Sequence, residues 1–373
     1  MRIAHVTDVY LPRLGGVELQ VHDLVTRQRA AGHDTLVITT TPGPSGRRVV
    51  RLGDDLLGAG PYRVLPGRSL VDVLRVYGVD VVHAHVSALS PMAWTAGGLA
   101  ASSGRPTVVS VHSMWHGMVR LVRGYARLRS AATWPVMWAA VSNAAAAAVS
   151  EALDGTPVTV LPNGIDPAEW RLPTPPRAGG VPTIVSVMRM VRRKRPRALL
   201  GAVRALRATH GRRFRAVLVG DGPLLPGLRR EVTDAGLGDQ VRLTGALDRD
   251  AIRRLLATAD LYVAPAPRES FGIAALEARS AGVPVLARAG SGVADFVRHG
   301  TEGWLVGSDE ELYATIAALL DDPGRLAAVA AHNRAVAPRV HWEAVLDTAD
   351  ALYAAAGLRH GVAPDRRLLG SPA

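Results

Sequence analysis

Residues 261–278 read Leu261-Tyr-Val-Ala-Pro-Ala-Pro-Arg-Glu-Ser-Phe-Gly-Ile-Ala-Ala-Leu-Glu-Ala278, and this stretch is the strongest indication of the fold class. Its first three residues are apolar and form strands readily, and the prolines that follow end the strand. A helix is expected to open at Gly272. A buried strand that turns into a helix is the repeating unit of a parallel α/β sheet.

Short apolar strands alternate with helical stretches along the rest of the chain as well. In the first half the expected strands are Ile3–Val6, Leu36–Thr39, Val79–His83, Thr107–Val111, Met137–Val141 and Val158–Leu161. In the second half they are Thr183–Val187, Ala216–Val219, Val241–Leu243, Leu261–Val263 and Val283–Ala287. The expected helices include Val17–Ala31, Met92–Ala101, Arg197–Thr209, Arg249–Ala257 and Gly272–Ala281. The sequence therefore predicts two doubly wound α/β domains with a crevice between them.

A proline-rich stretch separates the two series of strands. Residues 171–182 contain four prolines and two glycines. Proline lacks the N–H that a sheet needs and disfavours helix in the residue before it, so this stretch is expected to be a linker. The predicted domains are residues 1–170 and 183–339, and residues 361–373 are expected to form a flexible tail.

The composition is that of an ordinary globular protein, with 48% hydrophobic and 20% charged residues. The formal net charge of +12 invites a nucleic-acid-binding interpretation. Arginine carries nearly all of that excess, because Lys194 is the single lysine of the chain. Such a bias is typical of a GC-rich genome, so we disfavour a nucleic-acid partner.

The sequence also bears on the compartment. There is no cysteine, which excludes disulfides and thiolate chemistry and fits a reducing environment. The N-terminus lacks the pattern of a signal peptide, and the most apolar stretch, residues 134–149, is interrupted by Ser142 and Asn143. We therefore expect a cytoplasmic protein.

The start of the helix after residue 268 is suited to an anion. Ser270, Phe271 and Ile273 surround Gly272, whose missing side chain lets a ligand approach the backbone closely. Free N–H groups and the helix dipole favour negative charge there. Glu269 and Glu277 flank the site, at most roughly 12 Å apart along the helix axis, which suits a sugar nucleotide. The structural alternative is a helix cap at Glu269 and a solvated charge at Glu277.

Two cations follow the expected strand Thr183–Val187, at the end where such folds bind ligands. Arg189 can grip two phosphate oxygens at once, and Lys194 is a compact charge suited to a diphosphate. In the first half, Gly15 and Gly16 open the first helix and permit close contact with phosphate or sugar. His112 ends the strand Thr107–Val111, although a lone histidine is more often structural.

Taken together, these residues resemble glycosyltransferase family 4, a large family of retaining enzymes, over nearly the whole chain. The motifs that carry the resemblance are Gly15-Gly16-Val17-Glu18, Asp80-Val-Val-His-Ala-His85, His112, Val141-Ser142, Leu161-Pro-Asn-Gly-Ile-Asp166, Arg189 with Lys194, Val219-Gly-Asp-Gly222, and the pair Glu269 and Glu277. The opening residues 6–18 look like the phosphatidylinositol-directed branch, whose members transfer mannose or N-acetylglucosamine. The single lysine also falls on the lysine position of the family.

The resemblance implies the GT-B architecture, in which two Rossmann-like domains face a central crevice. It implies a role for each site residue: His112, Glu269, Arg189 and Lys194 as catalytic residues, and Gly15, Gly16, Arg189, Lys194, Glu269, Ser270, Phe271, Gly272, Ile273 and Glu277 as donor-binding residues. Neither a cofactor nor a metal is implied. Residues 340–360 are expected to form a helix that returns to the N-terminal domain.

The chain departs from the family pattern at two positions. Family members commonly have glycine where this chain has Met188 and Arg195. The backbone turn at the phosphate site is therefore in question, and Arg195 could add a phosphate contact. Two rival functions also stay open: a sugar-nucleotide epimerase on the same architecture, and a basic nucleic-acid-binding protein.

The acceptor and the donor base are left open by the sequence. Residues 115–129 mix apolar and cationic positions, as a helix on an anionic membrane surface does. A lipid acceptor with peripheral membrane contact at the inner face is therefore one expectation. A small soluble hydroxyl acceptor is the other. The donor could be GDP-mannose, UDP-N-acetylglucosamine or UDP-glucose.

Overall fold

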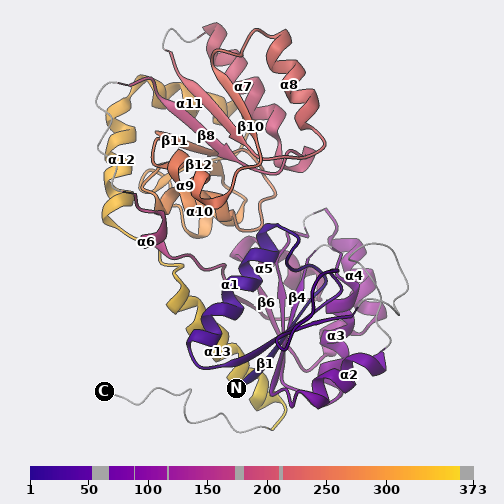
Figure 1. The fold of residues 1–373 in the computed structure, drawn as a ribbon. Coiled ribbons are helices and arrows are strands. Elements are labelled where there is room, and N and C mark those ends of the chain that lie inside the picture. Colours follow the sequence, from indigo (N-terminus) through magenta and orange to yellow (C-terminus); the bar gives the residue numbers. More distant parts are fainter. Residues whose placement is uncertain (53–66, 88, 116, 173–179, 210–212, 362–373) are drawn as a thin grey trace. The chain divides into compact units, whose positions relative to one another are not determined.

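The structure of the protein is a computed structural model that describes residues 1–52, 67–87, 89–115, 117–172, 180–209 and 213–361. Its contacts divide the chain into two compact units (Figure 1). The first unit combines Met1–Gly164 with Trp342–Ala373, and the second is Ile165–His341. The boundary comes before the expected linker, of which residues 173–179 lie outside the described residues.

The first unit is built on a parallel sheet of seven strands in the order β3-β2-β1-β4-β5-β6-β7. The strands are β1 (Arg2–Thr7), β2 (Asp34–Thr39), β3 (Val49–Arg51), β4 (Val81–Val86), β5 (Thr107–Val111), β6 (Met137–Ala140) and β7 (Val158–Val160). Strand β1 lies between β2 and β4, and His5 is in register with His83. Because side chains alternate along a strand, such partners point to the same face of the sheet.

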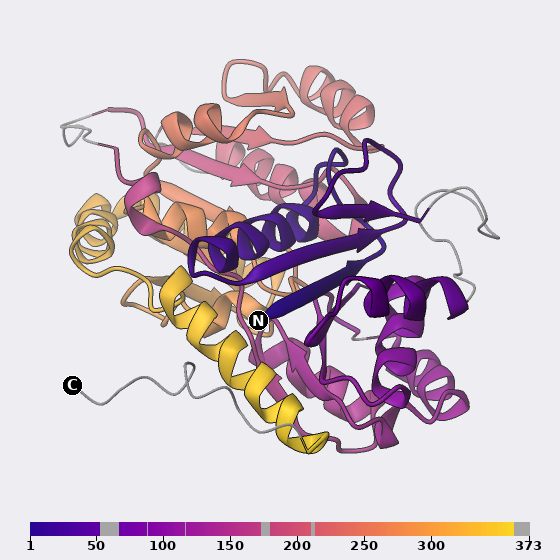
Figure 2. The same cartoon turned by 60° about the horizontal axis from the view of Figure 1, so that its bottom comes forward.

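Helices cover both faces of this sheet, which is why its central strands are buried throughout. They are α1 (Gly16–Ala30), α2 (Gly67–Val76), α3 (Pro91–Ser102), α4 (Val119–Leu128), α5 (Asn143–Ala152) and α13 (Trp342–Arg359), with the 3₁₀ turn η1 (Ala131–Thr133). Helix α13 lies beside α1 and against β5 and β6 (Figure 2). Its Trp342 and Tyr353 share an apolar core with Ile3 and Val108.

The second unit contains a parallel sheet of six strands in the order β10-β9-β8-β11-β12-β13. The strands are β8 (Thr183–Val187), β9 (Arg215–Val219), β10 (Val241–Gly245), β11 (Leu261–Ala264), β12 (Val285–Arg288) and β13 (Gly303–Val306). The helices are α6 (Pro167–Trp170), α7 (Pro196–Thr209), α8 (Leu225–Asp234), α9 (Arg249–Leu256), α10 (Ile273–Ser280), α11 (Asp309–Asp321) and α12 (Pro323–Ala335), with 3₁₀ turns η2 (Arg192–Lys194) and η3 (Gly292–Asp295). One large apolar core joins β8, α7 and α11.

The predicted α/β class with two doubly wound parallel sheets is confirmed. Several details differ from the expectation. Strands β3 and β13 and helices α11 and α12 were not predicted. The strand expected at Val79–His83 is β4, Val81–Val86, so His85 also belongs to the sheet.

Candidate active site

The backbone conformation at the start of α10 depends on one glycine, Gly272. Gly272 has φ +93°, in the left-handed region, and a Cβ there would lie 2.6 Å from Val293 Cγ2. Only glycine fits this position without strain. The N-cap residue Gly272 has no side chain with which to cap the helix. The preceding Phe271 is buried against Phe296, which anchors the loop. The N–H groups at this helix start are therefore suited to an anion.

Lys194 and Glu269 are brought together by the fold. Lys194 ends η2, just after β8, and its Nζ donates a hydrogen bond to Glu269 Oε2. Their side chains are 21% and 17% exposed, so the pair is partly screened by solvent. Glu269 is also fixed through its backbone, because its carbonyl accepts the N–H of Gly292 at 2.8 Å. A cation and a carboxylate thus lie together immediately before the open helix.

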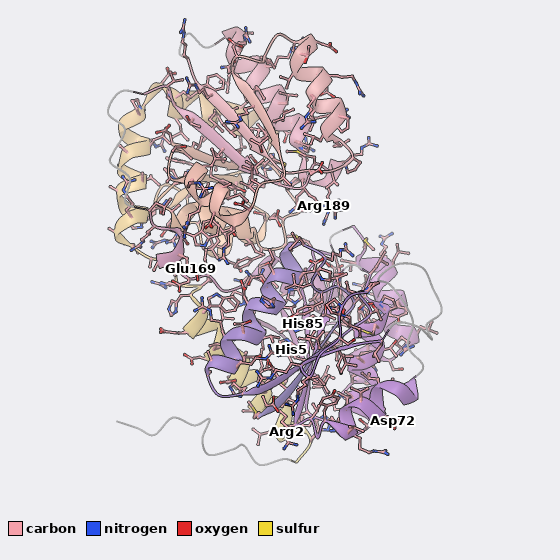
Figure 3. All side chains as sticks on the ribbon, viewed as in Figure 1. Arg2, His5, Asp72, His85, Glu169 and Arg189 are labelled. Atoms are coloured by element: carbon pink, nitrogen blue, oxygen red, sulfur yellow. The ribbon has the colours of Figure 1, made fainter. Side chains whose placement is uncertain are left out.

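Arg189 lies in the turn after β8, and its side chain is exposed (Figure 3). The backbone on either side of it contacts the loop Val219–Gly222. A Cβ on Gly220 would lie 1.9 Å from the carbonyl oxygen of Met188, and the N–H of Met190 donates to Asp221 at 2.9 Å. The glycine is required because two backbones pass too closely for a side chain. This packing fixes the direction in which the Arg189 backbone leaves the strand.

Tyr262 lies near the carboxylates of Glu269 and Glu277. Its ring is buried on β11, and its hydroxyl donates to the carbonyl of Val187 at 3.1 Å. Burial raises the pKa of this phenol, and the nearby charges of Glu269 and Glu277 raise it further. The tyrosine therefore stays neutral, and its hydrogen bond joins β11 to β8 near both glutamates. Glu277 itself is half-buried on α10.

The two departures from the family pattern have a structural explanation. Arg195 adopts φ +57°, the left-handed conformation that glycine favours, so the turn keeps its shape with another residue. Its guanidinium pairs with Asp309, which also accepts a hydrogen bond from Arg288 at 2.9 Å. The Arg195 side chain is therefore held by an ion pair within the second unit. Met188 is partly buried against the apolar core of the unit.

In the first unit, the glycine pair begins α1. Gly15 precedes the helix in an extended conformation and, as the N-cap residue, has no side chain with which to cap it. A Cβ on Gly15 would lie 2.4 Å from Glu18 Oε2. Glu18 is buried and pairs with Arg13 at 3.1 Å. A side chain at position 15 would therefore require the Glu18 carboxylate to move.

His112 follows β5 and lines a pocket of the first unit together with Gln20, His85, Asn163 and Trp342. Its N–H donates to the carbonyl of Val86 at 2.7 Å, which continues the sheet. Its Nε2 lies 3.0 Å from His85 Nδ1. Burial lowers the pKa of His112 to about 4, because it penalises the charged imidazolium. The ring is therefore neutral near pH 7.

Sequence reasoning singled out His112 alone among the histidines as a site residue. The structure places His5, His83 and His85 in contact with one another behind it. The spacing of His83 and His85 could have indicated this, since residues two apart on a strand share a face. The partnership with His5 depends on the β1–β4 register, which the sequence does not reveal.

The stretch expected to contact a membrane, residues 115–129, forms α4 and the residues around it, with residue 116 outside the described set. Leu121 and Leu128 are 73% and 81% exposed, whereas Trp115 is buried. Arg123 and Arg127 both pair with Asp154. Part of the positive charge is thus neutralised within the unit. Among the described residues, no helix is both long and apolar enough to cross a membrane.

Comparisons with known proteins agree with this geometry. Residues 14–169 match the family Glycosyltransferase Family 4, and residues 173–336 match Glycosyl transferases group 1. A GDP-mannose-dependent alpha-(1-6)-phosphatidylinositol monomannoside mannosyltransferase of Mycobacterium tuberculosis is 28% identical over 363 residues, covering 89% of this chain and 92% of the relative. A D-inositol 3-phosphate glycosyltransferase of Thermobispora bispora is 40% identical over 128 residues, which is 34% of this chain and 30% of that relative.

A solved structure has the same fold over nearly its whole length. The crystal structure of Anabaena HepE in complex with UDP and glucose superposes with a TM-score of 0.74 at 20% identity, covering 94% of this chain and 99% of that one. The two family matches span both units, and the fold is that of the GT-B enzymes. The chain therefore belongs to glycosyltransferase family 4, the group 1 glycosyltransferases, a retaining family, and is an enzyme that takes its sugar from a nucleotide-sugar donor.

Proposed function

We propose that the protein transfers a hexosyl group, with retention, from a nucleotide diphosphate sugar to a hydroxyl of a lipid or a small molecule. The observation that carries this proposal is the pairing of Lys194 with Glu269 immediately before α10, whose N-cap residue is the glycine Gly272. The cation and the backbone N–H groups match the negative diphosphate of such a donor, which is also the leaving group. The carboxylate matches the hydroxyls of the sugar.

The donor residues of the second unit are assigned as follows. Arg189 and Lys194 neutralise the diphosphate, and the backbone from Ser270 to Ile273 donates hydrogen bonds to it. Glu269 holds hydroxyls of the transferred sugar. Glu277 lies eight residues further along, roughly 12 Å along the axis, and holds the ribose.

Gly15, Gly16 and His112 are the residues of the first unit that we assign to the same reaction. The glycines let the backbone approach the phosphates closely. His112 contacts the donor sugar near the reacting carbon. Its neutral imidazole makes it a hydrogen-bonding group there and not a cation.

We infer a front-side reaction for the chemical step. The bond between the anomeric carbon and the diphosphate oxygen breaks, and the acceptor oxygen bonds to the same face of that carbon. The departing phosphate oxygen takes the acceptor proton. Arg189 and Lys194 stabilise the negative charge that develops on the leaving group, so the enzyme needs no metal ion for this purpose.

The acceptor proposal includes a lipid because of α4 and a similar mannosyltransferase. Exposed Leu121 and Leu128 accompany the exposed Arg120 and Arg129 on or beside this helix. The Mycobacterium tuberculosis relative acts on a phosphatidylinositol mannoside, and the similarity covers 89% of this chain. The local similarity to an inositol phosphate glycosyltransferase supports the soluble alternative. Peripheral attachment through residues 115–129 at the inner membrane face is part of the lipid proposal.

A thermal-shift screen tests the donor site directly. UDP, GDP, UDP-glucose, UDP-N-acetylglucosamine and GDP-mannose are each added to the full chain. A ligand at a hundred times its Kd stabilises the folded state by about 2.7 kcal/mol, which gives a clear rise in Tm. We expect one base series to give this rise. No rise with any nucleotide at millimolar concentration would contradict the proposal.

The acceptor is tested next, with the donor that the screen selects. Transfer to phosphatidylinositol in vesicles is compared with transfer to soluble inositol phosphate. Product formed only with phosphatidylinositol vesicles indicates a lipid acceptor. Product formed with soluble inositol phosphate indicates a small soluble acceptor. Isomerisation of the free donor without any acceptor would instead indicate an epimerase.

A further inference from the structure

The face of the first sheet covered by α1 and α13 contains a cluster of buried polar side chains. Figure 3 shows two of them, His5 and His85, close together in the interior of this unit. His5 on β1 and His83 on β4 are in register, and His85 is in register with Ser110 on β5. The helices add Gln28 from α1 and Tyr353 from α13. All of these side chains are buried.

One chain of hydrogen bonds runs from Gln28 to His112. Gln28 Oε1 lies 2.7 Å from His5 Nε2, and His5 Nδ1 lies 3.0 Å from His85 Nε2. His85 Nδ1 then lies 3.0 Å from His112 Nε2. We name Gln28, His5 and His85 the histidine relay.

The direction of these bonds follows from the chemistry of each group. The Gln28 carbonyl oxygen has no proton, so His5 must donate from Nε2. Burial lowers the pKa of His5 to about 3 and that of His85 well below its ordinary value. Both rings are therefore neutral with one N–H each. His5 Nδ1 must accept from His85 Nε2, and His85 Nδ1 must accept from His112 Nε2.

A second branch of the cluster is consistent with this direction. The Gln28 amide nitrogen donates to the Tyr353 hydroxyl at 2.8 Å. That hydroxyl can then donate to His83 Nδ1 at 2.8 Å, and His83 Nε2 to Ser110 at 2.7 Å. The amide orientation of Gln28 thus sets the direction of both branches, and the reverse orientation would reverse them both.

One ring nitrogen from each of His5, His83 and His85 lies within 4.8 Å of the other two, close enough to hold a metal ion. Both nitrogens of each ring already have a hydrogen-bond partner in the cluster. An ion would have to displace several of these bonds. The complete pairing of donors with acceptors favours proton placement over metal binding.

We propose that the histidine relay is a set of positioning residues that hold the proton of His112 on Nε2, so that Nδ1 is presented to a hydroxyl of the reacting sugar as a hydrogen-bond acceptor. The inference rests on the proposed function for the contact with the sugar. His112 Nδ1 has no hydrogen bond to any other residue in the described part of the chain, and the ring lines a pocket. The relay residues touch no substrate and act through His112.

The first test needs no variant. Histidines of the full chain are labelled with ¹⁵N, and long-range ¹H–¹⁵N spectra report which nitrogen carries the proton. The His112 signals are assigned by their loss in His112→Gln. The proposal requires the neutral Nε2–H form at pH 7. The Nδ1–H form, an imidazolium, or stoichiometric zinc in the purified protein would overturn it.

The second test separates positioning from structure. Gln28→Met removes the acceptor at the far end of the relay, and Ser110→Ala removes one hydrogen bond from the other branch of the same cluster. With the donor selected above, Gln28→Met should lower kcat about tenfold, as expected for one hydrogen bond lost in the transition state, with KM unchanged. Its His112 spectrum should show a mixture of tautomers. Ser110→Ala should keep kcat within twofold. Equal losses in both variants would mean a merely structural role.

A third measurement separates this inference from the proposed function. The nucleotide sugar should shift the Nδ1 signal of His112, whereas the nucleoside diphosphate alone should not. If His112 has the predicted tautomer and neither ligand shifts Nδ1, the proposed sugar contact is wrong and the tautomer assignment stands.

Discussion

Replacing Lys194 with alanine removes the cation that pairs with Glu269 before α10. Two unit charges about 4 Å apart interact by about 4 kcal/mol at an effective dielectric constant of about 20. Because the two side chains are 21% and 17% exposed, solvent screens part of this. We expect Lys194→Ala to cost the transition state about 2–3 kcal/mol of attraction to the leaving diphosphate. This corresponds to a loss of about 30- to 150-fold in kcat/KM.

The same loss has a second contribution from Glu269. Without Lys194, the Glu269 carboxylate repels the nearby diphosphate. The losses in kcat/KM of the single variants Lys194→Ala and Glu269→Gln should therefore not be additive in the double variant. Lys194→Arg should also be impaired, because a planar guanidinium does not replace a compact ammonium group.

The assay is steady-state transfer with the donor chosen by the thermal-shift screen. Arg193→Ala is the matched control, because Arg193 is an exposed cation in the same turn, η2, with no assigned contact. The control should stay within twofold of the parent. A folded Lys194→Ala protein whose kcat/KM also stays within twofold would refute the assignment of the diphosphate site.

Further predictions concern the backbone at Gly272 and Arg195, the pH dependence of stability at Glu302, and the effect of removing metal ions. Gly272→Ala should lower stability by about 1–2 kcal/mol, because its Cβ would meet Val293 2.6 Å away at positive φ, and a melting curve equal to the parent's would contradict this. Arg195→Gly should keep activity and raise stability by up to about 1 kcal/mol, and a tenfold loss of kcat/KM would mean that Arg195 contacts phosphate after all. Burial acts to raise the pKa of Glu302, but hydrogen bonds from Arg298 and nearby arginine charges outweigh it and lower the pKa to about 2. The parent's stability advantage over Glu302→Gln should therefore be fully present above pH 4.5 and disappear as the pH falls towards 2, and a pH-independent difference in urea unfolding would exclude this. Transfer should survive EDTA, and a loss reversed by magnesium or manganese would show that a metal serves the diphosphate.

The fold could be predicted from the sequence because strand and helix alternate so regularly. Buried strands such as Thr183–Val187 appear with the expected bounds, since a parallel strand covered on both faces is mostly apolar. β3 was not predicted, because Val49–Arg51 has only two apolar residues before an arginine. Its pairing with β2 decides its conformation, and pairing is a tertiary property.

The candidate site was predicted unevenly for a similar reason. Lys194 and Glu269 stand at the ends of parallel strands, so their meeting follows from the general rule for such sheets. The contact of Gln28 with His5 depends on how α1 packs over β1, which no local pattern encodes. Arg195 shows the opposite case: its sequence breaks the family's glycine pattern, yet its backbone keeps the left-handed turn.

A crystal structure with the nucleoside diphosphate that stabilises the protein most is the most direct test of the donor site. We predict that diphosphate oxygens lie within hydrogen-bonding distance of Lys194 Nζ and of the backbone N–H groups at the start of α10, with the Lys194–Glu269 pair loosened. A nucleotide bound elsewhere, with that pair and the helix start left as they are, would contradict the assignment.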